Sequence, residues 1–569
     1  MDEKIIRQWT LMFYFASDNP LASAIVSQLK AIKAAGFHKE ANVLAYFDPQ
    51  PKNMPSHVFD VNLVEKLKRP GTRRFSFKGD DAFVRNLVFD RLWTEEDSDT
   101  KESLQQYFKK EKHIDYESET VPATLTREQS PRDSLHGFLE FCRMNYPASH
   151  YMLIILGHGV VVGNDIFLLD ENVPDVDDAV AISTEPTNPP TAQMVRKSVR
   201  NSLTLKGLGE ELIDFTSKIG KEGQLELLGL HSCSMSGLEV AFELQGTANY
   251  LLASQGPAFV GSWPYRQILT RVFNDLNKRE NDSKTKLKDR LKKIFAYCIQ
   301  NSYDFQLAGY SFDIALCDLS VLKADKKKSI TVPLNELSSA LIKGLKARDG
   351  RAKEIIKGLI LLAHWDAQSF WQEQYTDLYD FCFRLSRRCE DYAKTGGYAK
   401  AVPGVKTISA ACKNMIKVLK QGKQGAENAL IVRSGFIGPL FQYSHGLSVF
   451  FPWSEPVDRK FLERYAKYKF TIDSAKGDTW LDFLNTYFVE TRRELDRPVG
   501  KPAMENRLLA VLQKVSNSIS GGDGLGKGPG DPTGDSCECP TIKNYPSSTE
   551  KPSPNVADRF EEQFQKAAV

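Results

Sequence analysis

Cys233 and His158 are the residues whose types and surroundings best suit covalent chemistry. Cys233 follows the apolar run 225–230, and His158 follows the apolar run 151–156. Short apolar runs predict buried strands, and neighbouring parallel strands end at one edge of a sheet. A histidine at that edge would lie beside the thiol and take its proton. A helix predicted at 238–244 would place its N-terminus near the sulfur and favour the thiolate. The pattern therefore predicts a cysteine nucleophile and a histidine general acid/base.

Backbone groups beside these two residues complete the predicted chemistry. Gly159 has no side chain, so its N–H can approach a substrate carbonyl closely. Together with the N–H of Cys233 it would form an oxyanion hole. This chemistry requires no metal or other cofactor. The only closely paired cysteines, in Cys537-Glu538-Cys539, lack nearby His or Cys partners, so no metal site is predicted.

Simpler interpretations of these residues remain open on the motifs alone. A single buried cysteine is most often a small core hydrophobe, and Gly-His-Gly is a weak signal. His231 competes with His158 as the base, although on a strand it would share a face with Cys233 and line the pocket instead. The other cysteines in apolar or helical contexts are interpreted as structural: Cys142, Cys298, Cys317, Cys382, Cys389 and Cys412.

The elements that must position these residues follow a strand–helix–strand pattern. Residues 9–15 and 43–47 are apolar and aromatic runs, and the helical pattern 21–35 separates them. A parallel sheet with helices on its faces is therefore predicted. Further strands are expected at 250–253 and 311–316, in a chain that becomes mainly helical beyond residue 280.

Composition limits the classes of partner and compartment. The 569 residues carry a net charge of +3, with 41% hydrophobic and 26% charged residues, as is usual for a soluble globular protein. The small net charge favours no nucleic acid, and basic clusters such as 326–328 and 387–388 are interpreted as solvated faces. No apolar run is long enough for a signal peptide or a membrane span, so a cytoplasmic protein without a membrane partner is expected.

The chain resembles the clostripain-like cysteine peptidases over roughly residues 9 to 490. This family shares the caspase-type fold with legumains and gingipains. The residues that carry the resemblance lie in the expected order: Trp9 to Ala16 with Asp18-Asn19, Tyr146-Pro147-Ala148, Tyr151 to Gly159, Leu228 to Cys233, Leu238 to Ala241, Ala253-Ser254-Gln255, Trp263-Pro264-Tyr265, Gly446 to Trp453 and Trp480 to Leu484.

The resemblance implies a fold, an activity and a route of maturation. The implied fold is a caspase-like three-layer α/β sandwich with a mostly parallel central sheet. The implied enzyme is a cysteine endopeptidase in which His158 and Cys233 form the catalytic dyad. Family members mature by cleavage of a linker between the two catalytic residues, and residues 171–206 suit that role here. The resemblance also makes Ca²⁺ a possible bound ion. An uncontrolled cytosolic endopeptidase would be toxic, so we expect a zymogen that is cut by itself or by an upstream protease. The candidate cut sites are Arg196, Lys197, Arg200 and Lys206.

The clearest departure from the family lies two residues before the nucleophile. The family has an aspartate there that helps a pocket to hold Arg or Lys, whereas this chain has His231. The change removes a negative charge and puts a basic preference in doubt. Asp18 could compensate, or the pocket could favour a polar or acidic side chain. With Ser254, Gln255 and Trp263, these residues make up the predicted substrate-binding site.

The predicted organisation has four parts. Residues 1–280 form the catalytic core, and residues 281–516 form a mainly helical region that completes the peptidase. A Gly/Pro/Ser-rich linker at 517–555 and a short helix at 556–569 follow. Alternatives to the expected peptidase, which could act within a regulated proteolytic cascade, are a catalytically silent scaffold or binding protein and a different thiol enzyme such as an acyltransferase.

Overall fold

A single large sheet forms the centre of the computed structural model. The structure describes residues 6–15, 22–36, 38–47, 57–61, 73–77, 80–85, 131–157, 166–167, 203–220, 224–277, 284–301, 310–323, 330–370, 373–394, 402–420, 429–456, 462–463, 465–472 and 478–495. The ten strands of the sheet, in spatial order, are β14 (Ile431–Ile437), β11 (Phe312–Asp318), β10 (Tyr250–Ala253), β9 (Gln224–His231), β6 (Ala148–Leu156), β1 (Arg7–Phe15), β2 (Ala41–Phe47), β3 (His57–Asp60), β5 (Asp80–Arg85) and β4 (Arg73–Phe77).

The middle of the sheet is parallel, as the strand–helix–strand pattern predicts. Strands β10, β9, β6, β1 and β2 run parallel to one another, while β11 and β14 join one side antiparallel. On the other side β3 runs antiparallel to β2. The mostly parallel central sheet is thereby confirmed. The sheet also crosses the predicted boundary at residue 280, because β11 and β14 lie beyond it in sequence.

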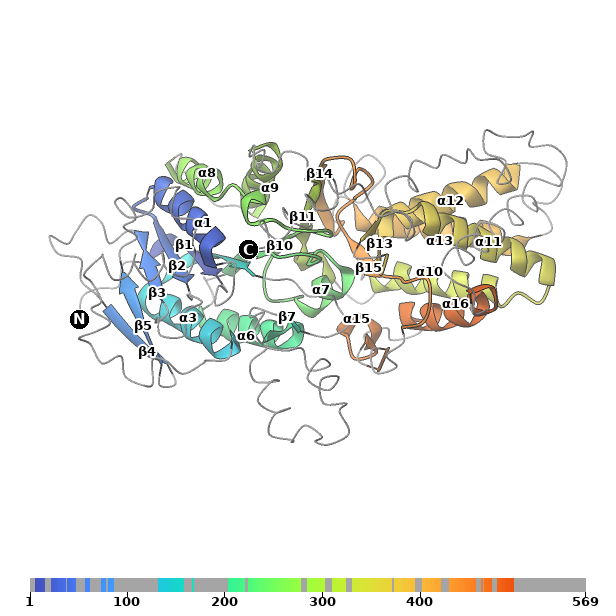
Figure 1. Ribbon diagram of the computed structural model, residues 1–569, viewed down its shortest axis with the longest axis horizontal. Coiled ribbons are helices and arrows are strands. Elements are labelled where there is room, and N and C mark those ends of the chain that lie inside the picture. The colour runs from blue at the N-terminus through green and yellow to red at the C-terminus, as the bar shows by residue number, and fades with distance from the viewer. Residues whose placement is uncertain are drawn as a thin grey trace, which may run out of the picture.

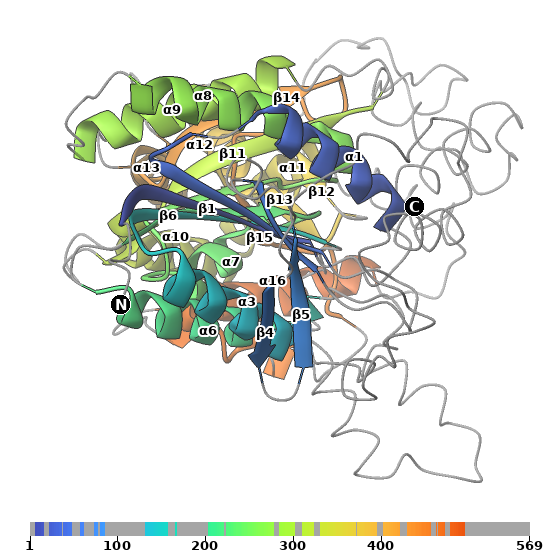
Figure 2. The ribbon, with the colours of Figure 1, turned by 90° about the vertical axis from the view of Figure 1, so that its left-hand side faces the viewer.

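Helices cover both faces of this sheet and make a three-layer sandwich (Figures 1 and 2). Alternate residues of β1 face opposite sides, so Met12 and Tyr14 belong to one apolar core while Leu11 and Phe13 belong to the other. One face is covered by α3 (Pro131–Asn145), α6 (Leu205–Lys218) and α7 (Leu238–Glu243), and the other by α1 (Ala22–Ala34), α8 (Tyr265–Asn277) and α9 (Lys284–Asn301).

The C-terminal part is mainly helical, as predicted, and lies at one end of the sheet (Figure 1). Its helices are α10 (Thr331–Leu345), α11 (Gly350–Asp366), α12 (Leu378–Lys394), α13 (Pro403–Leu419), α15 (Lys469–Ile472) and α16 (Trp480–Leu495). A small antiparallel sheet of β12 (Ser369–Phe370), β13 (Tyr375–Asp377) and β15 (Ser448–Phe450) accompanies them. The remaining short elements are the strands β7 (Ile166–Phe167) and β8 (Leu203–Thr204) and the 3-10 turns Val260–Ser262 and Leu319–Lys323.

Glu239 fastens the C-terminal part to the core. Its side chain is fully buried in α7, and Oε1 accepts the backbone N–H of Phe450 at 2.8 Å and the hydroxyl of Tyr465 at 2.7 Å. Burial raises the pKa of this carboxyl group. Two donors more than 200 residues away therefore depend on a single oxygen of α7.

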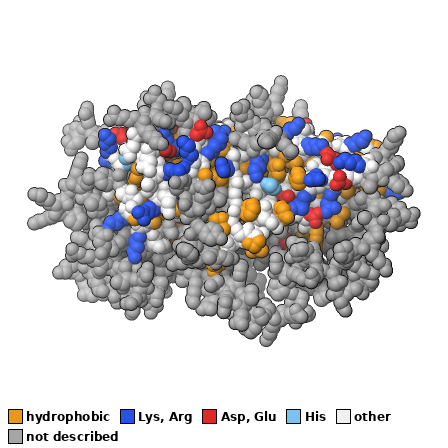
Figure 3. All heavy atoms as spheres, turned by 90° about the horizontal axis from the view of Figure 1, so that it is seen from above, with side chains coloured by type: hydrophobic (Ala, Val, Ile, Leu, Met, Phe, Trp, Pro, Cys, Tyr) orange, Lys and Arg blue, Asp and Glu red, His pale blue; other side chains and the backbone are white. Residues whose placement is uncertain are grey.

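Basic side chains of the helical part contact acidic and aromatic residues of the same part. Arg388 pairs with Asp366, and the guanidinium of Arg387 lies 5.6 Å from the ring centroid of Phe383. On the face seen in Figure 3, Lys and Arg side chains lie among acidic and apolar ones. No described helix is long and apolar enough to span a bilayer.

Replacing Glu239 with Ala should lower the free energy of unfolding by about 2–4 kcal/mol, because two buried donors lose their acceptor. Urea denaturation measures this change. The matched control is Glu336→Ala on the exposed side of α10, where a change within about 0.5 kcal/mol is expected. Equal effects of the two variants would contradict the proposed role of Glu239 as a fastening point.

Candidate active site

Cys233 lies just beyond the carboxyl end of β9, beside the end of β6. The two strands are parallel neighbours, and Leu156 of β6 is in register with His231 of β9. Cys233 stands two positions after His231, and His158 stands two positions after Leu156. His158 and Gly159 lie outside the described residues. The adjacency of the two strands that precede the predicted nucleophile and base is thus established.

The sulfur of Cys233 is held by the loop after β10. The backbone N–H of Ala258 donates to Sγ at 3.4 Å, and Sγ lies 3.8 Å from the carbonyl oxygen of the same residue. Burial raises the pKa of the Cys233 thiol, while the Ala258 N–H acts to lower it. The predicted helix N-terminus is not directly at the sulfur, because α7 begins at Leu238. The resting group is therefore a protonated thiol that needs a base.

Cys233 is nevertheless the one accessible cysteine among the six whose side chains the structure describes. It is partly exposed, whereas Cys142, Cys317, Cys382, Cys389 and Cys412 are buried. Burial raises the pKa of Cys142, Cys317, Cys389 and Cys412, which disfavours their reactive thiolates. Partial exposure at a strand end therefore separates Cys233 from the cysteines that fill the core.

The chain after the cysteine turns sharply. Ser234 has φ +57°, a left-handed conformation that is uncommon for a residue with a side chain. Its N–H donates to the carbonyl of Gly256 at 3.0 Å, and the N–H of Ser236 donates to the carbonyl of Ser254 at 2.8 Å. The hydroxyl of Ser236 donates to the carbonyl of Gly446 at 2.7 Å. The segment from 233 to 237 is thus held on one side by residues 254–258 and on the other by residues 446–448.

His231 is buried and uses both ring nitrogens within the protein. Its exposure is 2%, and Nε2 lies 2.7 Å from the carbonyl oxygen of Phe259, so this nitrogen must carry the proton. Nδ1 then accepts the hydroxyl of Tyr265 at 2.7 Å. Burial lowers the pKa of His231 to about 3, so the ring is neutral. Cys233 and His231 come from one strand end, as predicted, but the His231 ring faces the interior rather than an open pocket.

Trp263 explains why the His231 ring stays in the interior. The two rings stack with centroids 4.5 Å apart and planes 7° apart, and Trp263 is 1% exposed. Trp263 also packs against Gly229, which stands two residues before His231 on the same strand, and a Cβ at Gly229 would lie 2.9 Å from the indole. Trp263 was predicted to bind substrate, but it is buried and packs against the end of β9.

The two remaining described members of the predicted substrate site are also buried. Ser254 is 2% exposed and Gln255 is 0% exposed. The side chain of Gln255 donates to Oδ2 of Asp377 at 2.9 Å and accepts the N–H of Gly446 at 2.7 Å. Gln255 therefore connects the loop beside Cys233 with the C-terminal part. Direct substrate contacts by Ser254, Gln255, Trp263 and His231 stay a prediction that their burial does not support, and Asp18 lies outside the described residues.

The sequence analysis missed one buried acid in this region, Asp313 of β11. Its carboxylate is 1% exposed and accepts the N–H of Gln255 at 2.9 Å and the N–H of Gly256 at 2.8 Å. The signal in the sequence is an aspartate inside the otherwise apolar run 312–317. Lys, Glu, Arg and Asp are rarely buried without a specific role.

Of the four candidate processing residues, Lys206 lies within the described part of the chain. Arg196, Lys197 and Arg200 lie outside the described residues. Lys206 is exposed in the first turn of α6, where the hydroxyl of Thr204 caps the helix by accepting the N–H of Gly207 at 2.9 Å. Just before this helix, β8 pairs antiparallel with β7, so residues 166–167 and 203–204 lie side by side.

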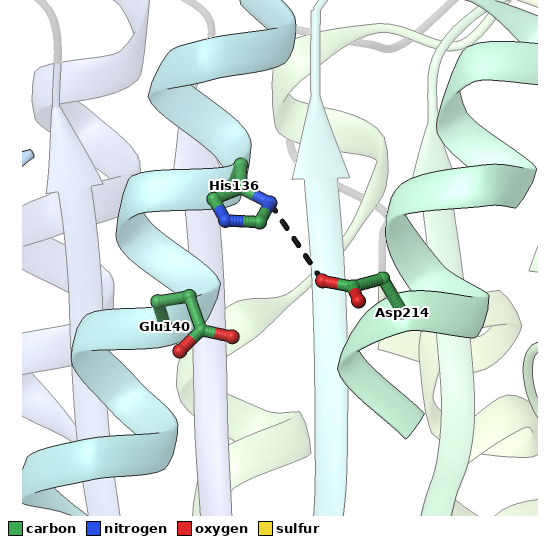
Figure 4. A group of neighbouring side chains, drawn as sticks. All are labelled: His136, Glu140 and Asp214. Carbon is green, nitrogen blue, oxygen red and sulfur yellow. Dashed lines mark ion pairs between the residues drawn. The ribbon is translucent and has the colours of Figure 1, made fainter. Parts of the chain in front are cut away.

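One group of described residues has the ligand types and spacing of a metal site. His136 and Glu140 of α3 face Asp214 of α6, with ligand atoms within 4.8 Å of one another (Figure 4). The ammonium of Lys218 lies 2.7 Å from Asp214 Oδ2 and 3.1 Å from Glu140 Oε1, where a bound cation would be expected. Ca²⁺ takes six to eight oxygen ligands, so a three-residue group with an imidazole does not fit it. The arrangement is an ion-pair network between two helices.

Comparison with known proteins places this site in a family. The model of the clostripain family, peptidase family C11, matches residues 192–482, which is more than half of the chain. The chain belongs to the clostripain family and is a cysteine protease, hence a hydrolase. The three-layer α/β sandwich with a mostly parallel central sheet, expected from the sequence, is confirmed. A search of curated protein sequences found no significant match.

Solved structures of two bacterial proteases are similar to this chain. An inactive zymogen C11 protease from Parabacteroides distasonis is 14% identical, with 83% of this chain and 99% of that chain covered and a TM-score of 0.40. A secreted C11 cysteine protease from Bacteroides thetaiotaomicron, bound to an irreversible peptide inhibitor, is 12% identical, with 82% and 99% covered and a TM-score of 0.42.

Replacing Gly229 with Ala should displace Trp263 and unstack it from His231. A Cβ at this position would also lie 3.0 Å from Ile154, so the strand cannot simply shift away. We expect a loss of about 1–3 kcal/mol in unfolding free energy, measured by urea denaturation, with a change in Trp fluorescence of the folded protein. Gly350→Ala is the control, because no atom lies within 4 Å of the added carbon. A stable variant with unaltered fluorescence would show that Trp263 does not depend on the missing side chain.

Proposed function

We propose that the protein is a cysteine endopeptidase in which Cys233 is the nucleophile and His158 the general acid/base. The observation that carries this proposal is the position of Cys233. Among the six cysteines whose side chains the structure describes it is the partly exposed one, and it stands at the end of a strand whose parallel neighbour leads to His158. The carboxyl edge of a parallel sheet is where α/β proteins place ligands and reactive groups.

The chemistry follows from a thiol that is protonated at rest. His158 accepts the Cys233 proton as the sulfur attacks the peptide carbonyl carbon and a C–S bond forms. The N–H groups of Cys233 and Gly159 donate to the oxyanion. His158 then gives its proton to the leaving amine as the C–N bond breaks. Water, deprotonated by His158, attacks the thioester and releases the acid and the thiol. No step requires a metal, and the family's Ca²⁺ enters none of them.

Maturation by cleavage within residues 171–206 suits the described structure around this segment. Strand β7 precedes the segment and β8 lies near its end, and the two strands pair with each other, at Ile166 with Thr204 and Phe167 with Leu203. A cut between them leaves both new ends attached to the body of the protein. Arg196, Lys197 and Arg200 are the proposed sites, because Lys206 belongs to a capped helix that would have to unwind before cleavage.

The specificity of this site is proposed to differ from that of a pocket with an acid before the nucleophile. His231 is neutral and buried, so it supplies neither the negative charge of the family aspartate nor a positive one. A preference for Arg or Lys would therefore need another acid, for which Asp18 is the candidate. Without it, a polar or acidic substrate side chain is favoured.

The biological setting remains a prediction from the sequence. A cytoplasmic zymogen would act on protein or peptide substrates, within a regulated cascade and with an upstream activating protease. A silent scaffold or binding protein, and an acyltransferase that passes the thioester to an acceptor other than water, are the competing functions.

The wild type and Cys233→Ala, run on a denaturing gel after purification, test self-processing. We expect two fragments from the wild type and an intact chain from Cys233→Ala and from His158→Ala, since both variants lack one half of the dyad. Sequencing of the fragment N-termini gives the residue before the cut. An intact wild type would exclude unaided self-processing.

Labelling with a thiol-reactive peptide inhibitor after limited proteolysis then separates the competing functions. Failure of wild-type Cys233 to react after cleavage would support the scaffold. Labelling without hydrolysis of a peptide library, together with transfer to an added amine, would support the acyltransferase.

A further inference from the structure

We propose that Asp313 is a positioning residue for the nucleophile, acting through the loop at residues 254–258. Its carboxylate does not touch Cys233 but holds the loop that does. This inference rests on the proposed role of Cys233 and adds a residue that the reaction depends on.

The chain of contacts from Asp313 to the sulfur has two steps. The carboxylate accepts two successive backbone N–H groups, from Gln255 to Oδ2 at 2.9 Å and from Gly256 to Oδ1 at 2.8 Å. The next part of the same loop supplies the Ala258 N–H that donates to Sγ of Cys233 at 3.4 Å. The direction of that N–H, which favours the thiolate, therefore depends on the loop that Asp313 holds.

The same loop also fixes the residue that follows the nucleophile. The carbonyl of Gly256 accepts the N–H of Ser234 at 3.0 Å, and Ser234 has the uncommon φ of +57°. A conformation of this kind persists only where surrounding contacts determine it. Gly256 is closely packed, since a Cβ there would lie 3.2 Å from Oδ1 of Asp313 and 3.1 Å from the ring of Phe441.

Among the described residues, no cationic side chain is paired with the Asp313 carboxylate. Asp377 of β13 lies close enough to disfavour a second negative charge. Lys420 lies near Asp377 and forms a 3.1 Å contact with Nδ1 of His445. The two N–H groups of Gln255 and Gly256 are thus the main stabilisation of the Asp313 anion.

This placement makes the loop sensitive to protonation. Burial, with the charge of Asp377, raises the pKa of Asp313 to about 7. A protonated carboxyl group carries its proton on one oxygen, and that oxygen accepts an N–H more weakly than a carboxylate oxygen does. One of the two loop contacts is therefore weakened as the pH falls through about 7.

The sign of the linked stability change is opposite to that of the activity. The folded-state pKa lies above the value of 3.8 for an ordinary aspartate. The folded protein therefore binds the proton more readily, and ionisation of Asp313 costs stability as the pH rises from about 4 to 7. Groups whose pKa is strongly shifted by burial and a neighbouring charge are concentrated at functional sites.

The test is the rate at which iodoacetamide alkylates Cys233 in the full-length protein between pH 5 and 9, quantified by mass spectrometry of the Cys233 peptide. In the wild type, the reaction needs the thiolate and is faster while Asp313 is ionised, so the logarithm of the rate should rise more steeply than one per pH unit between about pH 6 and 7, and with a slope of one on either side. In Asp313→Asn the slope should be one, with a rate roughly tenfold lower at pH 8, because the thiolate loses an ordered N–H donor.

Asp318→Asn is the matched control, since Asp318 is a buried acid at the far end of the same strand and contacts Lys288 at 2.9 Å. Its profile should equal that of the wild type. A wild-type slope of one throughout pH 5 to 9, which needs no variant to measure, would overturn the proposal. So would the steeper segment persisting in Asp313→Asn, or a wild-type rate in that variant at pH 8.

Failure of the proposed function gives a different result. If Cys233→Ala still hydrolyses dye-labelled casein after activation, Cys233 is not the nucleophile, whatever the alkylation profiles show. If that variant is inactive and Asp313→Asn behaves as the wild type, the nucleophile stands and only the positioning role of Asp313 is wrong.

Discussion

The active site depends on one constraint, which is that the chain must leave the sheet at Cys233 and turn back at once. The turn puts Ser234 at φ +57°, a conformation that costs of order 1–3 kcal/mol. Backbone hydrogen bonds to Ser254 and Gly256 on one side, and from Ser448 on the other, hold the turn in place. Each contributes about 0.5–1.5 kcal/mol, so together they offset the strain. The nucleophile is exposed because the surrounding chain fixes this turn.

The strand ends that carry Cys233 and His158 could be predicted from the sequence for a simple reason. Buried parallel strands are continuous, mostly apolar runs, here 151–156 and 225–230, and the residues that end them at 157–159 and 231–233 stand out. Apart from the adjacency of these two strands, the order of strands in the parallel centre was not predicted, because apolar runs do not show which strands are neighbours. The edge strand β14 was missed because its residues 433–437 are partly buried or exposed and mix polar with apolar side chains. Such a segment carries little periodic signal.

The role of His231 could not be predicted, because it depends on residues distant in sequence. Alternation along a strand predicts that residues 231 and 233 share a face, but it does not show what covers that face. Here Trp263 stacks on the imidazole. The carbonyl of Phe259 accepts from Nε2, and the hydroxyl of Tyr265 donates to Nδ1. The same limit applies to Gln255, whose partners Asp377 and Gly446 come from the C-terminal part. Pocket residues inferred from motifs alone therefore proved to be buried supports.

The β-bridge between Gly237 and Ser448 affects when the active-site turn can form during synthesis of the protein. Ser448 contacts Ser236 across 212 positions of the chain. At a synthesis rate of roughly 5–20 residues per second, the second partner follows the first by some tens of seconds or less. Until then the segment after Cys233 lacks one of its two supports on the ribosome. The nucleophile thus acquires its final surroundings late in translation, after the core strands have been made, and a truncated chain retains the cysteine without the complete turn.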